Sequence, residues 1–314
     1  MKLNSTPVER IDFCGYPVFV KRDDMLHPEF SGNKARKFRF FLDNDFPYVR
    51  RLISFGSPQS NALYSLSALA KMKGWQFDYY VDHIADQVLK STQGNFVGAC
   101  INGANVINLS QVADRRERSC SAYIDDLVSK DDDSVLVIPE GGRCEYAQYG
   151  ISQLGEEILI WMRAQQLNEL WVFLPSGTGT TALYLASFFK KKGHSVHVMT
   201  CAAVGGSDYL KQQFSQLVSN TCFHPNVIEV PKKFHFGQLY RPFYEMWKRL
   251  NDTGIEFDLL YDPLGWIVLE SYLLQNDLLQ HKCQKKPSRP ILYIHQGGLL
   301  GNASMLPRYQ RKFG

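Results

Sequence analysis

Short runs rich in Val, Ile, Phe and Tyr alternate with longer amphipathic segments along this 314-residue chain, and this alternation constrains the fold more than any other feature. The strand-like runs are 18–21, 52–55, 77–81, 106–109, 135–138, 170–174, 196–200, 257–261 and 291–295. The helical patterns between them include 62–73, 151–166, 181–191 and 210–218. Strands that alternate with helices predict an α/β fold with mainly parallel sheets flanked by helices. Because these runs outnumber the strands of a usual sheet, we expect two α/β units, with a seam near Asp45 and another near Pro139.

Composition excludes several classes of protein. The net charge of +4 is small and evenly spread, which argues against a nucleic-acid partner. The seven cysteines are an odd number without a Cys-x-x-Cys pair, which argues against a disulfide framework and a metal site. The chain has no signal-peptide-like start and no apolar run of membrane-spanning length, so we expect a cytoplasmic protein.

A glycine-rich turn follows the predicted strand 170–174 and opens a helix. It comprises Ser176, Gly177, Thr178, Gly179, Thr180 and Thr181. Backbone N–H groups and hydroxyls at a helix N-terminus suit a phosphate, although a capped tight turn would use the same residues. No lysine follows the second glycine as in a Walker motif, and the stretch 197–204 lacks the acidic residue of a dinucleotide site. A mononucleotide or a phosphorylated cofactor remains.

A second polar turn, Ser57–Asn61, follows the strand 52–55 and precedes a helix. Ser60 and Asn61 can cap that helix, or a serine hydroxyl, an amide and free N–H groups at this helix N-terminus can bind a carboxylate. Both interpretations stay open here.

A third segment, Ser31–Lys37, places Lys34, Arg36 and Lys37 at the start of a helix. Cations at a helix N-terminus oppose the helix dipole, so an anionic partner would remove a conflict. An exposed basic turn is the alternative. A lysine, a phosphate turn and a carboxylate site together favour pyridoxal phosphate (PLP) with an amino-acid substrate, because PLP chemistry needs all three.

The Ser31–Lys37 segment resembles the Gly-Gly-Asn-Lys-x-Arg-Lys segment of the 1-aminocyclopropane-1-carboxylate (ACC) deaminase and D-cysteine desulfhydrase family. Ser54–Asn61 resembles the Ser-x-Gly-x-x-Gln-Ser-Asn turn of the same family. Further motifs at 94–95, 139–142, 176–181, 262–263 and 295–298 follow in the family's order. The resemblance implies a PLP enzyme of fold type II, like the tryptophan synthase β subunit. It also implies a large domain of residues 1–44 and 139–314 and a small domain of residues 45–138.

The resemblance assigns roles to individual residues. Lys34 would form the Schiff base with PLP and then act as the base, and Lys37 would contact the phosphate. Asn61 would lie near the 3-hydroxyl of the cofactor. Gln59, Ser60 and Asn61 would form the substrate site, with Ser60 also catalytic, and the turn Ser176–Thr180 would hold the phosphate. Relatives suggest a homodimer, although no segment marks an interface.

The chain departs from ACC deaminases at two tyrosines, which are replaced by Phe236 and Gly265. The acidic partner of the pyridine nitrogen is missing too, and Trp266 stands after Gly265. Tyr240 and Tyr261 could substitute for the lost hydroxyls, and Arg143 could bind a carboxylate or wall off the site.

These features lead to a functional prediction. We expect a PLP-dependent deaminase or lyase that performs a D-cysteine desulfhydrase-like β-elimination and gives a 2-oxo acid and ammonia. ACC deamination is the alternative, although it needs the missing tyrosines. A PLP-binding protein with little turnover and a nucleotide-binding module are alternatives from other classes.

Overall fold

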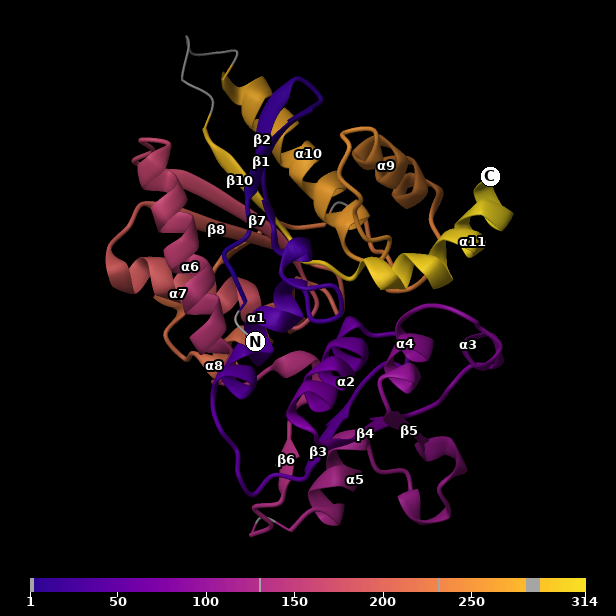
Figure 1. Ribbon diagram of the computed structural model, residues 1–314. Coiled ribbons are helices and arrows are strands. Elements are labelled where there is room, and N and C mark those ends of the chain that lie inside the picture. Colours follow the sequence, from indigo (N-terminus) through magenta and orange to yellow (C-terminus); the bar gives the residue numbers. More distant parts are fainter. Residues whose placement is uncertain (1–2, 130, 231, 281–288) are drawn as a thin grey trace.

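The computed structural model describes residues 3–129, 131–230, 232–280 and 289–314, which fold around two β-sheets (Figure 1). The strands are β1 (Val8–Phe13), β2 (Tyr16–Arg22), β3 (Arg51–Phe55), β4 (Gln76–Val81), β5 (Ala104–Asn108), β6 (Val135–Val137), β7 (Leu170–Ser176), β8 (Val196–Ala202), β9 (Asn226–Val227) and β10 (Ile291–His295). The helices are α1 (Gly32–Asp43), α2 (Asn61–Lys73), α3 (Asp86–Leu89), α4 (Asn95–Ile101), α5 (Cys120–Leu127), α6 (Ala147–Ala164), α7 (Thr180–Lys192), α8 (Ser207–Leu217), α9 (Arg241–Asn251), α10 (Asp262–Gln280) and α11 (Asn302–Phe313).

The large lobe comprises a six-stranded sheet in the order β1-β2-β10-β7-β8-β9 together with α6 to α11. Its neighbouring strands are parallel except for the antiparallel pair β1–β2, which is closed by a turn with positive φ at Cys14 and Gly15. All five residues of β10 are buried, as expected for a central strand covered on both faces. Apolar residues of α6 and α7 cover one face of this sheet, and those of α9 and α10 cover the other.

The small lobe comprises a four-stranded parallel sheet in the order β5-β4-β3-β6 together with α2 to α5. Helix α2 packs on one face through Leu63, Leu66 and Leu69. Helix α5 packs on the other face through Ile124. Figure 1 shows this lobe below the large one, with the N-terminal part of the chain and α1 between the two sheets.

Helix α1 belongs to the packing of both lobes. Its Phe38 and Phe41 join the small-lobe core around Leu52 and Leu63. On another side of the helix, Arg36 reaches α6, where its Nη1 lies 2.6 Å from Glu157 Oε1. Because α1 packs in both lobes, the division into a large domain of residues 1–44 and 139–314 and a small domain of residues 45–138 stays a prediction.

The α/β class and the mainly parallel sheets are confirmed. Each predicted strand overlaps an observed strand except 257–261, which is irregular. In that segment side chains satisfy the backbone: Asp258 Oδ1 accepts from the N–H groups of Leu260 and Tyr261, and Asn302 Oδ1 accepts from Leu259 N. The apolar character of the segment reflects burial in the core of the large lobe, where Phe257 is fully buried. The expectation of a strand was therefore wrong.

Two strands were not predicted, β1 and β9. Strand β1 alternates polar and buried residues at the edge of the sheet, and β9 has only two residues. No helix in the described part of the chain is both long and apolar enough to cross a membrane.

Candidate active site

A cavity of about 420 Å³ lies between the lobes. Segments that directly follow β3, β6, β7, β8 and β10 line it, so the carboxyl ends of strands from both sheets meet there. Open α/β sheets bind ligands at this position. The predicted residues in its wall are Lys34, Lys37, Gln59, Ser60, Asn61, Ser176, Gly177, Thr178 and Gly179. Thr180 does not line the cavity but is buried behind it, with Oγ1 3.1 Å from Thr178 Oγ1.

Lys34 and Lys37 lie on the first turns of α1 and line the cavity, and neither has a carboxylate partner in the part of the chain that the structure describes. Lys37 Nζ donates to Gly141 O at 3.0 Å and to Thr178 Oγ1 at 3.1 Å, and Lys34 Nζ lies 3.5 Å from the same carbonyl. Burial lowers the pKa of Lys34 to about 8, against an opposing effect of Glu140. Burial and then the Lys34 charge lower the pKa of Lys37 well below its usual value. Arg36, in contrast, pairs with Asp23 and Glu157 and has its anionic partners within the protein.

The turn after β7 holds a polar group that has no partner. Thr181 Oγ1 is buried and makes no hydrogen bond among the described residues. Gly179 begins α7 with a φ of +71°, and a Cβ atom there would lie 2.3 Å from Phe214 Cε1. Only glycine fits this turn. This turn places the Thr178 hydroxyl against Lys37 Nζ, and the N-terminus of α7 lies beside the cavity.

The turn after β3 is held by contacts within the small lobe. Ser60 caps α2, because its Oγ accepts from Leu63 N at 3.1 Å. Ser60 Oγ also lies 3.0 Å from Tyr79 Oη. Asn95 Nδ2 donates to Asn61 Oδ1 at 2.7 Å and to Gln59 O at 3.0 Å. The cap on α2 is confirmed, and the Asn95 contact fixes the amide of Asn61 with its oxygen already occupied.

Tyr79, Glu140 and Asp258 are among the cavity-lining side chains to which the sequence assigned no role. Tyr79 is fully buried on β4, where its position in a Phe-Asp-Tyr-Tyr-Val strand gives no signal of function. Glu140 lies within the glycine-rich motif 139–142, in which the resemblance assigns it no role. Burial raises the pKa of the Asp258 carboxyl, and the N–H groups of Tyr261 and Leu260 partly offset that shift. Asp258 therefore places a carboxyl group in the cavity wall, although its Oδ1 already accepts from two backbone N–H groups.

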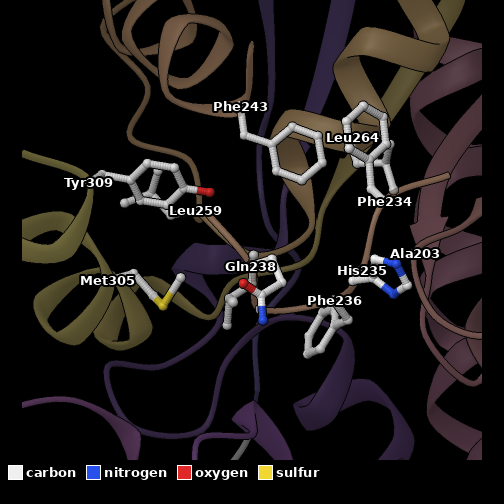
Figure 2. A pocket seen from close by; sticks show the side chains of 12 residues that line it. Ala203, Phe234, His235, Phe236, Gln238, Phe243, Leu259, Leu264, Met305 and Tyr309 are labelled. Carbon is white, nitrogen blue, oxygen red and sulfur yellow. The ribbon is translucent and has the colours of Figure 1, made fainter. Parts of the chain in front are cut away.

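The two tyrosine replacements have different structural consequences. At Gly265 a Cβ atom would lie 2.9 Å from Tyr293 Oη and 3.0 Å from Pro175 Cγ, so Tyr293 fills the space that a side chain would need. Phe236 lines the cavity, and its ring centroid is 5.1 Å from that of Tyr261. Figure 2 shows Phe236 at the edge of a smaller neighbouring pocket, where its ring points away from Phe243 and Leu264.

Of the other residues suggested for the site, Tyr261 lines the cavity, whereas Tyr240 and Arg143 do not. Tyr261 is half-buried in the cavity wall, and its hydroxyl lies 3.5 Å from where a Cβ atom on Gly177 would stand. Tyr240 does not line the cavity and accepts a hydrogen bond from His235 N. Arg143 contacts Gln216 and is likewise outside the wall. Tyr261 thus provides a phenol beside the cavity, and Arg143 neither closes the cavity nor reaches into it.

The residues present fit PLP in three respects. The half-buried Lys34 and the buried Lys37 lie together without a counter-ion among the described residues, which favours an anion. An unpartnered threonine hydroxyl and a helix N-terminus sit beside them, as a phosphate requires. A serine-capped helix start across the cavity presents polar groups for a carboxylate.

Comparisons with known proteins agree with this geometry. No family model matches the chain. A bifunctional D-cysteine desulfhydrase/ACC deaminase from Arabidopsis thaliana is 23% identical over 94% of this chain and 77% of its own length. A D-cysteine desulfhydrase from Yersinia pestis is 23% identical over 94% of this chain and 92% of its own. The solved structure of an ACC deaminase homologue superimposes with a TM-score of 0.78 at 17% identity, over 98% of this chain and 93% of that one.

These likenesses extend over nearly the whole chain and include both lobes and the cavity between them. The resemblance to the ACC deaminase and D-cysteine desulfhydrase family is therefore confirmed, and the fold is that of the PLP enzymes of fold type II.

Proposed function

We propose that this protein is a PLP-dependent enzyme that removes a β-substituent and the amino group from a small amino acid, as a D-cysteine desulfhydrase does. The observation that carries the proposal is the pair of the half-buried Lys34 and the buried Lys37, two amines with lowered pKa values and no carboxylate partner among the described residues. PLP, when bound, supplies an aldehyde carbon that bonds to an amine and a ring that accepts the electron pair released at Cα.

The lysines would have separate tasks. Lys34, with a pKa of about 8, holds a usable fraction of neutral amine near physiological pH. It can bond to the cofactor and, once displaced by the substrate's amine, take the proton from Cα. Lys37 is tied to Gly141 O and Thr178 Oγ1, so it would stay in place as a hydrogen-bond donor to the phosphate. The turn Ser176–Thr180 and the unpartnered Thr181 hydroxyl would complete that phosphate site.

The turn after β3 would bind the substrate. Gln59, Ser60 and Asn61 stand at the N-terminus of α2, where the helix dipole favours a carboxylate. Since Asn95 occupies the Asn61 oxygen, the Asn61 amide nitrogen is the atom left to donate to the cofactor or the substrate. Ser60 would orient the carboxylate and is itself held by Tyr79.

β-Elimination fits this site better than opening of a cyclopropane ring. The relatives' tyrosine positions are Phe236 and Gly265 here, and Tyr293 occupies the space at Gly265. A β-substituent that leaves as thiol needs neither hydroxyl. Turnover of ACC is therefore the second candidate, and a PLP-binding protein with little turnover is the third.

The test is turnover by the PLP-loaded protein. D-cysteine, L-cysteine and ACC are each incubated with it, and 2-oxo acid, sulfide and ammonia are measured. We expect products from cysteine in one configuration, a loss of at least about 100-fold in Lys34→Ala, and no change in Lys190→Ala, an exposed lysine at the end of α7. PLP binding without turnover of any substrate would leave only the binding role. A protein that binds no PLP would overturn the proposal.

A reducing cytoplasm and a homodimer complete the proposal. The six cysteines in the described part of the chain are free, which suits a reducing compartment. Light scattering on the purified protein tests the second point, with twice the 36.0 kDa chain mass as the expected result and one chain mass as the contrary one.

A further inference from the structure

Glu140 is a carboxylate in the cavity that the proposed function has not used. It begins the 3₁₀ turn Glu140–Gly142, directly after β6 and Pro139. Gly141 and Gly142 have φ values of +63° and +71°, and this bend turns the Gly141 carbonyl toward Lys34 and Lys37. The turn that places a carbonyl against both lysines therefore also places the Glu140 side chain in the cavity wall.

The Glu140 carboxylate has no hydrogen-bond or ion-pair partner among the residues that the structure describes. The Glu140 side chain is accessible and lines the cavity, whose wall also holds Ser60 and Asn61, both of which are engaged by neighbours. An unpartnered acid in such a place is a candidate for chemistry.

Gly56 and Tyr79 locate the Glu140 carboxylate relative to the proposed substrate site. A Cβ atom on Gly56 would lie 2.7 Å from Tyr79 Oη and 3.1 Å from Glu140 Oε1, so both oxygens border the same small space. Tyr79 Oη in turn lies 3.0 Å from Ser60 Oγ. The carboxylate therefore stands near the polar turn of the proposed substrate site, on the wall that also carries Gly141 and the lysines.

Charge couples Glu140 to Lys34. Burial raises the pKa of the Glu140 carboxyl, while the charges of Lys34 and Arg143 lower it and that of Asp82 raises it. Reciprocally, Glu140 raises the pKa of Lys34 against the larger effect of burial. Each group therefore shifts the pKa of the other, so the protonation states of Glu140 and Lys34 depend on each other.

We propose that Glu140 is a second acid–base residue, which protonates the departing β-substituent while Lys34 removes the proton from Cα. The inference rests on the proposed function. Lys34, as neutral amine, takes the Cα proton and becomes an ammonium. The released electron pair forms the Cα–Cβ double bond as the bond from Cβ to the leaving sulfur breaks, and its electrons stay on sulfur. The Glu140 carboxyl gives its proton to that sulfur, and the Lys34 ammonium then returns a proton to the Glu140 carboxylate.

This balance leaves both side chains as they began and releases the sulfur of cysteine as hydrogen sulfide. It also separates Glu140 from Lys34 experimentally, because a leaving group that needs no proton should not need Glu140. Chloride is such a group and a thiol is not.

The test compares D-cysteine with β-chloro-D-alanine, or their L forms if the wild type prefers those. We expect Glu140→Gln to lower kcat/KM for cysteine about 100-fold and to change that for β-chloroalanine less than about threefold. Glu140→Asp should recover part of the loss for cysteine. Glu145→Gln, which removes an exposed carboxylate outside this cavity, is the matched control and should change neither. Equal PLP content and circular dichroism in all variants establish intact folding.

A second readout does not depend on turnover. Because Glu140 raises the pKa of Lys34, the Glu140→Gln apoprotein should bind PLP with a pH midpoint below that of the wild type. An equal loss with both substrates would show that Glu140 only positions Lys34, and no loss with either would show that it is idle; each result overturns the inference. A wild type that acts on neither substrate would instead overturn the proposed function, and the inference with it.

Discussion

Lys34 and Lys37 stand one helical turn apart on α1, yet their surroundings differ. Lys37 donates two hydrogen bonds, to Gly141 O and Thr178 Oγ1, whereas Lys34 Nζ lies at a long 3.5 Å from Gly141 O and otherwise meets Lys37. A bonded amine is held in place, and a loosely held one can react and move. The division of labour between a phosphate contact and a reacting amine follows from these contacts.

The lowered pKa of Lys34 predicts how the apoprotein takes up PLP. Only the neutral amine attacks an aldehyde, so the association rate should rise with pH and level off above a midpoint of about 8. An unperturbed lysine would give a midpoint about two units higher, near 10.4. Stopped-flow absorbance after mixing apoprotein with PLP at a series of pH values measures this. A midpoint near that of a free lysine would contradict a buried Lys34.

The limits of sequence reasoning at this scale are seen in Tyr79 and Gly265. Tyr79 looks like any aromatic residue of a buried strand, and only the fold brings its hydroxyl to Ser60. At Gly265 a lost tyrosine is evident from the resemblance, but the reason is not, because Tyr293 comes from a strand almost 30 residues later. Lys34 and Ser60 could be found because each lies in a short motif with an unusual local composition.

At the scale of elements, the start of α1 depends on a close approach between backbones. Gly32 opens the helix with a φ of +62°, and a Cβ atom there would lie 1.7 Å from Gln296 O, just after β10. Asn33 N donates to the same oxygen at 3.1 Å. The residue that follows β10 therefore fixes the start of α1 and, with it, the position of Lys34.

Gly32→Ala should therefore displace the start of α1. We expect it to cost about 2–4 kcal/mol of unfolding free energy, from overpacking and a left-handed backbone, and to weaken PLP binding at least about tenfold, since a small misplacement of Lys34 suffices. Gly74→Ala is the matched control, because Gly74 also has a positive φ but meets nothing within 4 Å. It should cost about 1 kcal/mol and leave PLP binding unchanged. Urea unfolding and PLP titration measure both, and equal effects of the two changes would contradict this account.

The elements themselves were largely predictable from hydrophobic periodicity, because most strands here are buried and most helices amphipathic. The segment 257–261 shows where this fails. Its Phe-Asp-Leu-Leu-Tyr pattern reads as a strand, but Asp258 and Asn302 take up its backbone N–H groups and leave none for a neighbouring strand. A side chain that comes from 43 residues away has no local signal.

At the scale of the molecule, α1 ties the two lobes together and carries the reacting lysine. Its apolar side packs in the small-lobe core, and its Arg36 is buried against Asp23 and Glu157. Lys21 on β2 joins the same ion cluster, 2.7 Å from Glu157. Movement of one lobe against the other would therefore act on α1 and on the position of Lys34.

Asp23→Asn should destabilise the whole fold. It leaves Arg36 buried with one partner fewer, which we expect to cost about 3–5 kcal/mol of unfolding free energy. Asp43→Asn, which breaks the surface pair with Arg39 on the same helix, should cost less than about 1 kcal/mol. Denaturant titrations of the three proteins give these values, and a cost for Asp23→Asn no greater than that for Asp43→Asn would rule out the buried cluster as a tie.

The same cluster predicts how stability depends on pH. Burial raises the pKa of Asp23, but the charge and hydrogen bonds of Arg36 lower it more, so the folded pKa lies below the ordinary value. The contribution of Asp23 is then complete above about pH 4, the pKa of an unfolded aspartate, and is lost as the pH falls through the folded pKa. Thermal unfolding should show a steeper loss of stability below pH 4 in the wild type than in Asp23→Asn. Parallel curves would contradict the assignment.

The central claim is that Lys34 is the residue that bonds to PLP. Reduction of the PLP-loaded protein with borohydride fixes the cofactor to the amine that holds it, and peptide mapping by mass spectrometry then locates the label. The account predicts one equivalent of label on Lys34 in the wild type and in Lys190→Ala, and none in Lys34→Ala. A label on Lys37, or no label on a protein saturated with PLP, would contradict it.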